Sequence, residues 1–306
     1  MKRVAVVCVC SLLIALSCSS DGDDASSDTT AAPDTTESTT TVSTTALPPP
    51  LEDQSAPPSI NGIVVDGDTI WAASVAGDVV LQIDPATGAI LQRIPTNGAG
   101  PDDVEIGPDG NVYYTGFANG EVGVIEDGEA RVIAQLEPGA NPLGFTSDGT
   151  LYVGVAVSGD AFYRVPLDGG EPEQIATDLG NMNAFVVTDE DLILGPAGGA
   201  DGGVVLRVDP ADGSFEPVVT GLPPIFASDS DSEGNYYVLA SATGEVIEVD
   251  VDAGTFETVA TVEGAPFDNV AFAPDDTLYI SHFTTPQITA VDPDGATRVI
   301  DVGTAG

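Results

Sequence analysis

Asn and Asp side chains recur in this sequence at intervals of about 40 residues, near the start of similar short words. Five of them are candidate oxygen ligands for a metal ion: Asn61, Asp102, Asn141, Asn183 and Asp268. Carboxylate and amide oxygens are the ligands that Ca²⁺ and other hard divalent cations prefer. The alternative interpretation is that Asx residues at strand starts cap turns and satisfy backbone N–H groups.

Three side chains are candidates for proton transfer. His282 is the single histidine of the chain, and an imidazole exchanges protons near neutral pH. Asp102 and Asp268 are carboxylates, either of which could activate a water molecule. For His282, the alternative is a partly exposed loop histidine with no chemical role.

The stretch from Gly100 to Ile133 indicates which elements position these residues. It contains four short runs rich in Val, Ile and Tyr, separated by Asp-Gly turns and an Asn-Gly loop. Runs of this kind are typical of antiparallel strands in hairpin order. One such four-stranded unit cannot bury its own faces.

The same unit occurs six times. The word that follows its first turn appears, 39 to 44 residues apart, as DTIW, GNVYY, GTLYV, EDLIL, GNYYV and DTLYI. Six four-stranded units with this period predict an all-β fold, a six-bladed β-propeller of antiparallel blades, over residues 59–306. The sixth blade is expected to hold its own four strands, ending at 297–302, while residues 51–58 are available to latch onto an edge.

Topology predicts where the candidate ligands lie. The first strand of each blade is the innermost, so the residues that begin it lie nearest the channel. Loops between second and third strands share that face, which places His282 on the same face as Asp268. The five Asx residues are therefore expected to converge on one mouth of the channel.

The N-terminus predicts export. Lys2 and Arg3 precede an apolar run from Val4 to Leu16, which is typical of a secretory signal peptide over residues 1–17. The word Ala15-Leu16-Ser17-Cys18 resembles the lipobox of bacterial lipoproteins, although Ala15 stands where Leu is more usual. This resemblance implies a lipid on Cys18 and an extracytoplasmic, membrane-anchored protein. An uncleaved anchor or ordinary secretion is the alternative.

Residues 18–58 are predicted to be the lipidated cysteine followed by a disordered tether of Ser, Thr, Asp and Pro, since they have few large apolar side chains. Cys8 and Cys10 lie in the signal segment and Cys18 carries the lipid. The folded domain then has no disulfide and no thiolate metal site.

The charge balance is strongly acidic. The chain has 49 Asp plus Glu against 7 Lys plus Arg, and its net charge of −42 becomes −44 without Lys2 and Arg3. This excludes nucleic acid and anionic lipid surfaces as partners, so the membrane is reached only through the lipid. One interpretation of this charge is an acidic surface that aids solvation. The other is a negative electrostatic field that concentrates cations near the protein. A monomer is expected.

Other motifs narrow the chemistry. The words GxSxG, HExxH and CxxC are absent, which excludes serine-elbow hydrolases, zincins and dithiol chemistry. Asp229 to Gly234 matches the opening of a calcium loop but also coincides with a turn that every blade has. The glycine-rich run from Gly195 to Gly203 is predicted to be a flexible rim loop.

Three words, PDDVEIGPDGNVYY, FDNVAFAPDDTLYISHF and NGIVVDGDTIW, resemble those of the senescence-marker-protein/gluconolactonase family and of streptogramin lyases. The resemblance spans roughly residues 59–302 and implies action on cyclic esters at the channel mouth. In the gluconolactonase family a Glu, two Asn and an Asp bind a divalent metal. Asp102 matches the family's Asp and Asn61 matches one of its Asn residues by motif. Asn141 matches the second Asn by its place in the repeat. The Glu has no counterpart, and Asp268 is our suggested replacement.

The sequence thus predicts an envelope-tethered propeller that hydrolyses small lactones with Ca²⁺ or another divalent cation. The first alternative is a propeller without catalytic activity that binds a small molecule, glycan or protein. The second is a lyase like the streptogramin lyases, with His282 as the base.

Overall fold

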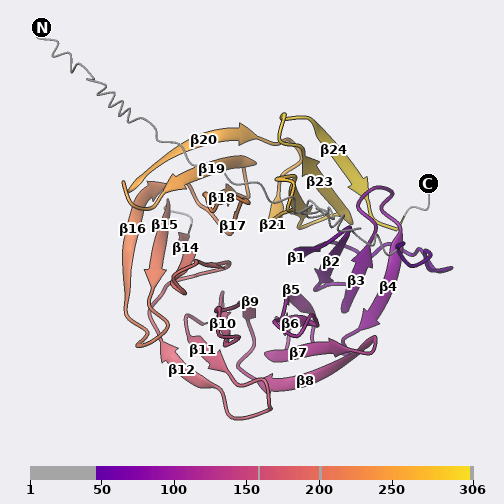
Figure 1. The fold of residues 1–306 in the computed structure, drawn as a ribbon, viewed down its shortest axis with the longest axis horizontal. Helices are drawn as coiled ribbons and strands as arrows, with labels where there is room; N and C mark the ends of the chain where they lie inside the picture. The colour runs from indigo at the N-terminus through magenta and orange to yellow at the C-terminus, as the bar shows by residue number, and fades with distance from the viewer. Residues whose placement is uncertain (1–45, 158, 200–201, 304–306) are drawn as a thin grey trace, which may run out of the picture. The chain divides into compact units, whose positions relative to one another are not determined.

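The computed structural model describes residues 46–157, 159–199 and 202–303 (Figure 1). The predicted signal peptide, Cys18 and the first part of the tether lie outside the described residues. Within the described ranges, no helix is long and apolar enough to cross a membrane.

Six sheets of four antiparallel strands stand around a central axis, which confirms the predicted six-bladed β-propeller (Figure 1). The innermost strands are β1 (Ile63–Asp66), β5 (Pro101–Ile106), β9 (Ala140–Phe145), β13 (Val186–Val187), β17 (Ala227–Ser230) and β21 (Phe267–Phe272). The second strands are β2 (Thr69–Ser74), β6 (Val112–Gly116), β10 (Leu151–Val155), β14 (Ile193–Gly199), β18 (Tyr236–Ala240) and β22 (Leu278–His282).

The third strands are β3 (Val79–Ile83), β7 (Glu121–Glu126), β11 (Phe162–Val165), β15 (Gly202–Val208), β19 (Glu245–Asp250) and β23 (Gln287–Val291). The outermost are β4 (Ile90–Pro95), β8 (Glu129–Gln135), β12 (Glu173–Ala176), β16 (Phe215–Leu222), β20 (Thr255–Thr261) and β24 (Thr297–Asp301). Each blade holds four strands that are consecutive in the chain, so blade 6 exchanges no strand with the N-terminus, as predicted.

The hydrophobic core lies between blades rather than within them. Each of the six seams between neighbouring blades has its own cluster of buried side chains. Trp71, for example, packs with Tyr114 between blades 1 and 2. Because alternate residues of a strand point to opposite faces, the second and third strands of every blade supply apolar groups to two seams. Burial of apolar surface therefore joins each blade to both neighbours.

The predicted rim loop at Gly195–Gly203 is wrong. Strands β14 and β15 run through most of it, and Gly195 pairs with Leu206. The glycine there serves packing, because a Cβ on Gly195 would lie 2.5 Å from the sulfur of Met182. At Gly198 and Gly202 the reason is the backbone, which has φ of +121° and +138°.

Residues 51–58 contact an edge of blade 1. Leu51 donates its N–H to Ile90 in the outermost strand β4 at 2.9 Å, within a compact unit that starts at Ala46. The segment predicted as the end of the tether thus latches onto an edge, the possibility that the sequence left open.

Hydrogen bonds between turns also connect neighbouring blades. Asp191 accepts bonds from the N–H and hydroxyl of Ser147 at 2.6 and 2.7 Å, which connects blades 3 and 4. At the equivalent position, Asp276 accepts from the N–H and hydroxyl of Ser232 at 2.9 and 3.1 Å, which connects blades 5 and 6.

We predict that Asp276→Ala lowers the free energy of unfolding by about 1 kcal/mol more than Asp127→Ala, because two hydrogen bonds between blades are lost. Both aspartates have positive φ, 62° and 52°, so both substitutions introduce similar backbone strain. Urea denaturation of the two variants measures the difference. Equal losses would show that the turn contacts do not stabilise the ring.

Candidate functional site

The predicted ligands lie around one mouth of the channel, where the inner strands begin. Asn61, Asp102 and Asn141 are buried, at 3%, 8% and 6% exposure, and Asn183 and Asp268 are mostly buried. They come from blades 1, 2, 3, 4 and 6, which are far apart in sequence.

Hydrogen bonds connect these residues across blades in two groups. The Asn61 side-chain amide donates to Asp268 Oδ2 at 3.0 Å, while its Oδ1 accepts the Val75 N–H at 3.0 Å. The Asn141 amide donates to Asn183 Oδ1 at 3.0 Å, and Asn183 donates to the Phe226 carbonyl at 3.4 Å. The amide of Asn61 is thus fixed with its nitrogen toward Asp268.

Asp102 stands apart because, among the described residues, no hydrogen-bond donor reaches its carboxylate. Burial, then the charges of Asp268 and Asp103, raise the pKa of Asp102 well above its usual value. Burial also raises the pKa of Asp268 to about 6, although the hydrogen bond from Asn61 opposes the shift. Two carboxylates therefore share a desolvated mouth and repel each other.

A deeper set of polar residues comprises Asp103, Glu105, Asp229 and Asn269. The sequence analysis singled out Asp229 only as part of a calcium-loop match and missed the other three. Asn269 donates to Asp103 Oδ1 at 3.0 Å, and Asp229 Oδ2 accepts the Phe272 N–H at 2.6 Å. All four line a cavity of about 230 Å³ in the channel. They occupy two equivalent repeat positions, one and three residues after the blade start, so comparison of the aligned repeats would have found them.

These deeper carboxyl groups are also strongly desolvated. Burial raises the pKa of Asp103 well above its usual value, that of Glu105 to about 7 and that of Asp229 to about 6. The charge of Asp229 contributes to the shift at Glu105, and that of Asp268 contributes at Asp103. Five carboxyl groups thus line one channel.

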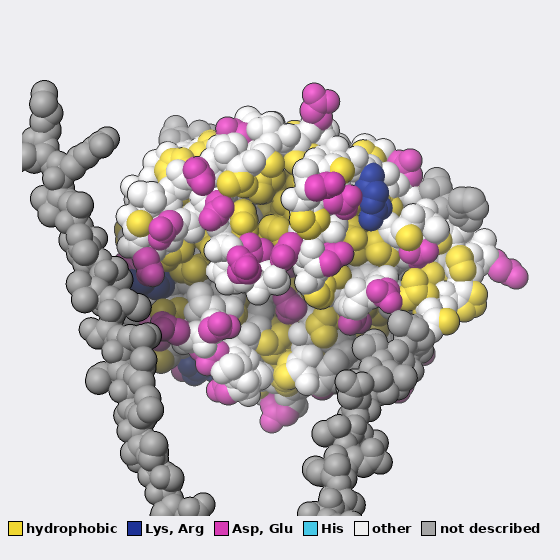
Figure 2. Space-filling model, turned by 45° about the horizontal axis from the view of Figure 1, so that its top comes forward, with side chains coloured by type: hydrophobic (Ala, Val, Ile, Leu, Met, Phe, Trp, Pro, Cys, Tyr) yellow, Lys and Arg dark blue, Asp and Glu magenta, His cyan; other side chains and the backbone are white. Residues whose placement is uncertain are grey.

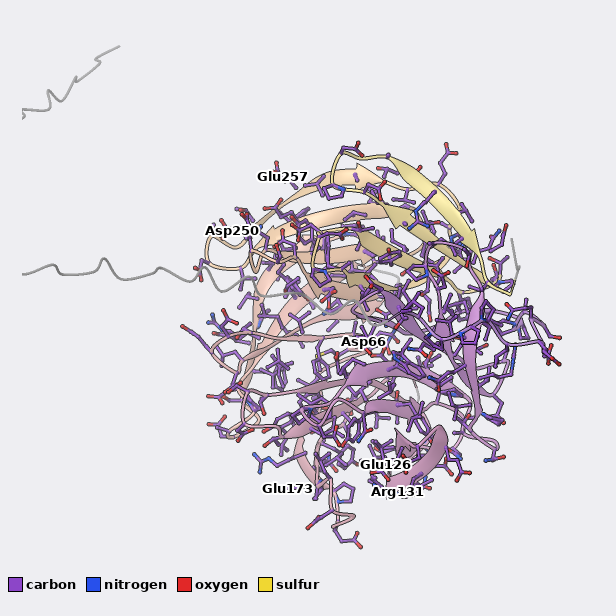
Figure 3. The ribbon with its side chains drawn as sticks, turned by 45° about the vertical axis from the view of Figure 1, so that its right-hand side comes forward. Asp66, Glu126, Arg131, Glu173, Asp250 and Glu257 are labelled. Atoms are coloured by element: carbon purple, nitrogen blue, oxygen red, sulfur yellow. The ribbon has the colours of Figure 1, made fainter. Side chains whose placement is uncertain are left out.

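The basic side chains of the described residues all lie away from the channel. The five arginines of the described residues are on third and outermost strands: Arg93, Arg131, Arg164, Arg207 and Arg298. Arg131 pairs with Glu126 at 2.7 Å on the hairpin of β7 and β8, where Figure 3 shows both side chains together. Figure 2 shows acidic side chains scattered over one face with few basic ones. The axial carboxylates therefore have no protein countercharge nearby.

The donor set restricts what cation would fit. Among the described residues, no three His, Cys, Asp or Glu side chains are grouped closely enough to hold a metal ion. The mouth instead offers two carboxylates and amide oxygens, a set suited to a hard cation and unsuited to Zn²⁺. The carboxylate of Asp102, to which no described residue donates a hydrogen bond, fits a cation nearby, since a charge in desolvated surroundings is costly.

His282 does not join the Asx residues. Its ring is 5% exposed, with Nε2 at 2.8 Å from Thr289 Oγ1 and an edge-to-face contact with Phe267 at 4.8 Å. Burial lowers its pKa. Phe267 belongs to the apolar cluster between blades 5 and 6, so the ring of His282 packs in that seam.

The calcium-loop match at Asp229 to Gly234 is the end of β17 followed by a turn. Asp231 accepts hydrogen bonds from the N–H groups of Glu233 and Asn235, from the Asn235 amide and from the Tyr237 hydroxyl, at 2.8 to 3.1 Å. Protein donors thus surround this carboxylate. A larger hollow of about 870 Å³ lies beside this turn, between blades 4 and 5, and contains none of the mouth residues.

No protein-family model and no curated protein matches the sequence. Solved structures match the fold. Streptogramin B lyase superposes with a TM-score of 0.63 at 12% identity, over 84% of this chain and 86% of that chain. A catalytically inactive His-to-Ala variant of virginiamycin B lyase from Staphylococcus aureus, solved with quinupristin, gives 0.62 at 13% identity, over 83% and 87%. The nidogen/laminin complex gives 0.63 at 12%, over 75% and 91%. Identities this low establish a shared propeller fold.

We predict that stability falls as pH rises through the range in which Asp268 ionises. Its folded pKa of about 6 exceeds the usual 3.8, so its contribution is full below about pH 4 and is lost by about pH 7. With a chelator present, Asp268→Asn should make the fall in unfolding free energy between pH 4 and pH 7 smaller by on the order of 2 kcal/mol. Denaturation of both proteins from pH 4 to pH 7.5 measures it.

Asp109→Asn is the control for this experiment. Burial acts to raise the pKa of Asp109, but hydrogen bonds from Asn111 and Tyr113 outweigh it and hold that pKa below its usual value. Stability from Asp109 is therefore lost only as pH falls below about 4. An Asp268→Asn profile parallel to that of the unchanged protein would contradict the burial of Asp268.

Proposed function

We propose that this propeller binds a divalent cation, Ca²⁺ or a similar ion, at its channel mouth and hydrolyses small lactones there. The observation that carries the proposal is the carboxylate of Asp102, which is buried, lacks a hydrogen-bond donor and lies near Asp268. The resemblance of the sequence words around Asn61 and Asp102 to those of gluconolactonases supports the reaction class. Two lyases, at 12% and 13% identity, share the propeller fold on which the proposal places this reaction.

The proposed cation ligands are Asp102, Asp268 and Asn141, with water completing the shell. Asn61 and Asn183 orient them, because Asn61 donates to Asp268 and Asn183 accepts from Asn141. With two carboxylates among the ligands, we expect a dissociation constant on the order of 10⁻⁴ to 10⁻³ M, as for weakly charged calcium sites. When bound, such an ion polarises a carbonyl oxygen.

The chain itself supplies the proton transfer. Asp268 is held through Oδ2 by Asn61, which leaves Oδ1 to accept a proton from the attacking water. Water oxygen adds to the lactone carbonyl carbon, the ring C–O bond breaks, and the proton passes to the departing alkoxide.

The electrostatics of the channel restrict the substrate. Five carboxyl groups line the mouth and the cavity below it, and the arginines of the described residues are on outer strands. An anionic lactone would be repelled, while neutral and cationic lactones would not. We therefore propose that the substrate is a neutral or positively charged lactone.

Two other functions remain as proposals. The structural neighbours that are lyases favour a lyase, and a His-to-Ala variant of one of them is catalytically inactive. In this chain the ring of His282 is buried against Phe267 and Thr289, which disfavours its use as a base. The nidogen/laminin neighbour favours a propeller that binds a partner without catalysis. His282→Ala abolishes activity only under the lyase proposal.

We predict that Ca²⁺ at millimolar concentration raises the melting temperature of the protein by a few degrees, because the ion compensates charges buried only in the folded state. Asp102→Asn should abolish the shift, while Asp66→Asn should retain it. Asp66 is an exposed carboxylate at the far end of β1, labelled in Figure 3. Differential scanning calorimetry with and without Ca²⁺ measures both.

The catalytic part of the proposal is tested by acid release from a neutral and an anionic lactone. We expect Ca²⁺-dependent hydrolysis of the neutral one, at least tenfold faster than that of the anionic one, and its loss in Asp102→Asn. A Ca²⁺-dependent melting shift without hydrolysis of any lactone would support the binding alternative. No shift and no hydrolysis would reject the cation site.

A further inference from the structure

Residues 51–60, here named the strap, follow the seam between blades 6 and 1. At one end Leu51 donates its N–H to Ile90 at the start of β4, at 2.9 Å. At the other end Ile60 donates its N–H to the carbonyl of His282, the last residue of β22, at 3.3 Å. In Figure 1 the beginning of the strap is the indigo segment beside β4.

Gln54 anchors the strap to the outermost strand of blade 1. Its Oε1 accepts the Ile90 N–H at 2.8 Å, and its Nε2 donates to the carbonyls of Ile90 and Leu51, both at 2.9 Å. One side-chain amide thus satisfies both backbone groups of an edge residue, as a neighbouring strand would. The guanidinium of Arg93 also donates to the Ser55 carbonyl.

The last described residues pack against the same strap. Gly303 has φ of +85°, and a Cβ there would lie 2.5 Å from the Gln54 carbonyl oxygen. The Gly303 N–H donates to Gly88 of blade 1 at 2.8 Å, and Arg298 of β24 donates to the Pro85 carbonyl at 2.8 Å. The C-terminal residues of blade 6 therefore lie between blade 1 and the strap.

This seam differs from the other five in connectivity. A loop of the chain joins each pair of consecutive blades, but blade 6 ends the ring and blade 1 begins it, and no strand is exchanged between them. Only non-covalent contacts hold the two together. The apolar cluster of this seam includes Ile90 of blade 1 and Ile300 of blade 6, and Leu51 of the strap packs against it.

We propose that the strap closes the propeller ring and holds Asn61, its next residue, at the channel mouth. The strap contacts both sides of the seam, and Asn61 continues it directly, with its N–H bonded to the Ala73 carbonyl at 2.9 Å and its side chain to Asp268 of blade 6. Ring closure and assembly of the mouth are therefore one event. This inference does not require that the mouth bind a cation or act on a lactone.

The test is amide hydrogen exchange on the full chain carrying Gln54→Ala. Exchange in β24 and at Asn61 should accelerate about tenfold relative to the unchanged protein, because the opening equilibrium of the seam shifts. Exchange in blades 3 and 4 should stay unchanged. Gln54→Glu keeps the acceptor for the Ile90 N–H but loses the donor, so it should give a smaller acceleration in the same segments.

The matched control is Gln135→Ala in blade 2. Gln135 likewise lies at an outermost strand and donates to two carbonyls, those of Asn119 and Leu136, at 2.6 and 3.1 Å. Its blade is joined to both neighbours by chain, so its loss should accelerate exchange only nearby. Acceleration confined to Ile90 in Gln54→Ala, with β24 and Asn61 unaffected, would overturn the proposal.

Discussion

The constraint on which the structure depends is that no blade can bury its own two faces. Apolar side chains from every blade pack into two seams, and six clusters of buried residues occupy the six seams. The sheets therefore surround a common axis, and their inner strands point to it. Polar residues at the inner strand ends are drawn together even though they come from distant parts of the chain.

That geometry has an electrostatic consequence. Asp102, Asp103, Glu105, Asp229 and Asp268 lie along the channel, while the arginines of the described residues lie on outer strands, as Arg131 does beside Glu126. Carboxylates in such surroundings either hold protons or attract cations. The hydrogen bond from Asn61 orients the carboxylate of Asp268, whereas no described residue donates a hydrogen bond to the carboxylate of Asp102. A site organised in this way favours positive ligands over negative ones.

Much of this followed from the sequence because the repeat encodes the fold directly. Turn words spaced about 41 residues apart predicted six blades, and the places of Asn61, Asp102, Asn141 and Asp268 at the starts of inner strands predicted that they converge. Amide orientation did not follow, since whether Asn61 presents oxygen or nitrogen to the channel depends on the Val75 N–H.

Two other features depend on tertiary contacts that a repeat does not encode. The glycines after Ile193 suggested a loop, yet Met182 packs over Gly195 within a strand. His282 lies at the same end of blade 6 as Asp268, because it pairs with Phe267, but alternation along β22 turns its ring into the seam with Phe267. An edge contact of residues 51–58 was foreseen as a possibility, but the roles of Gln54 and Leu51 as its anchors were not, because the composition of the segment is that of a tether.

The central claim is that the axial carboxylates exist to hold a cation. Crystals soaked in millimolar Mn²⁺, examined by anomalous scattering, test this claim most directly, because the ion would be located by its own signal. We predict an anomalous peak at the channel mouth, in contact with Asp102 and Asp268. Peaks confined to outer turns, or an unoccupied mouth at saturating ion, would contradict it.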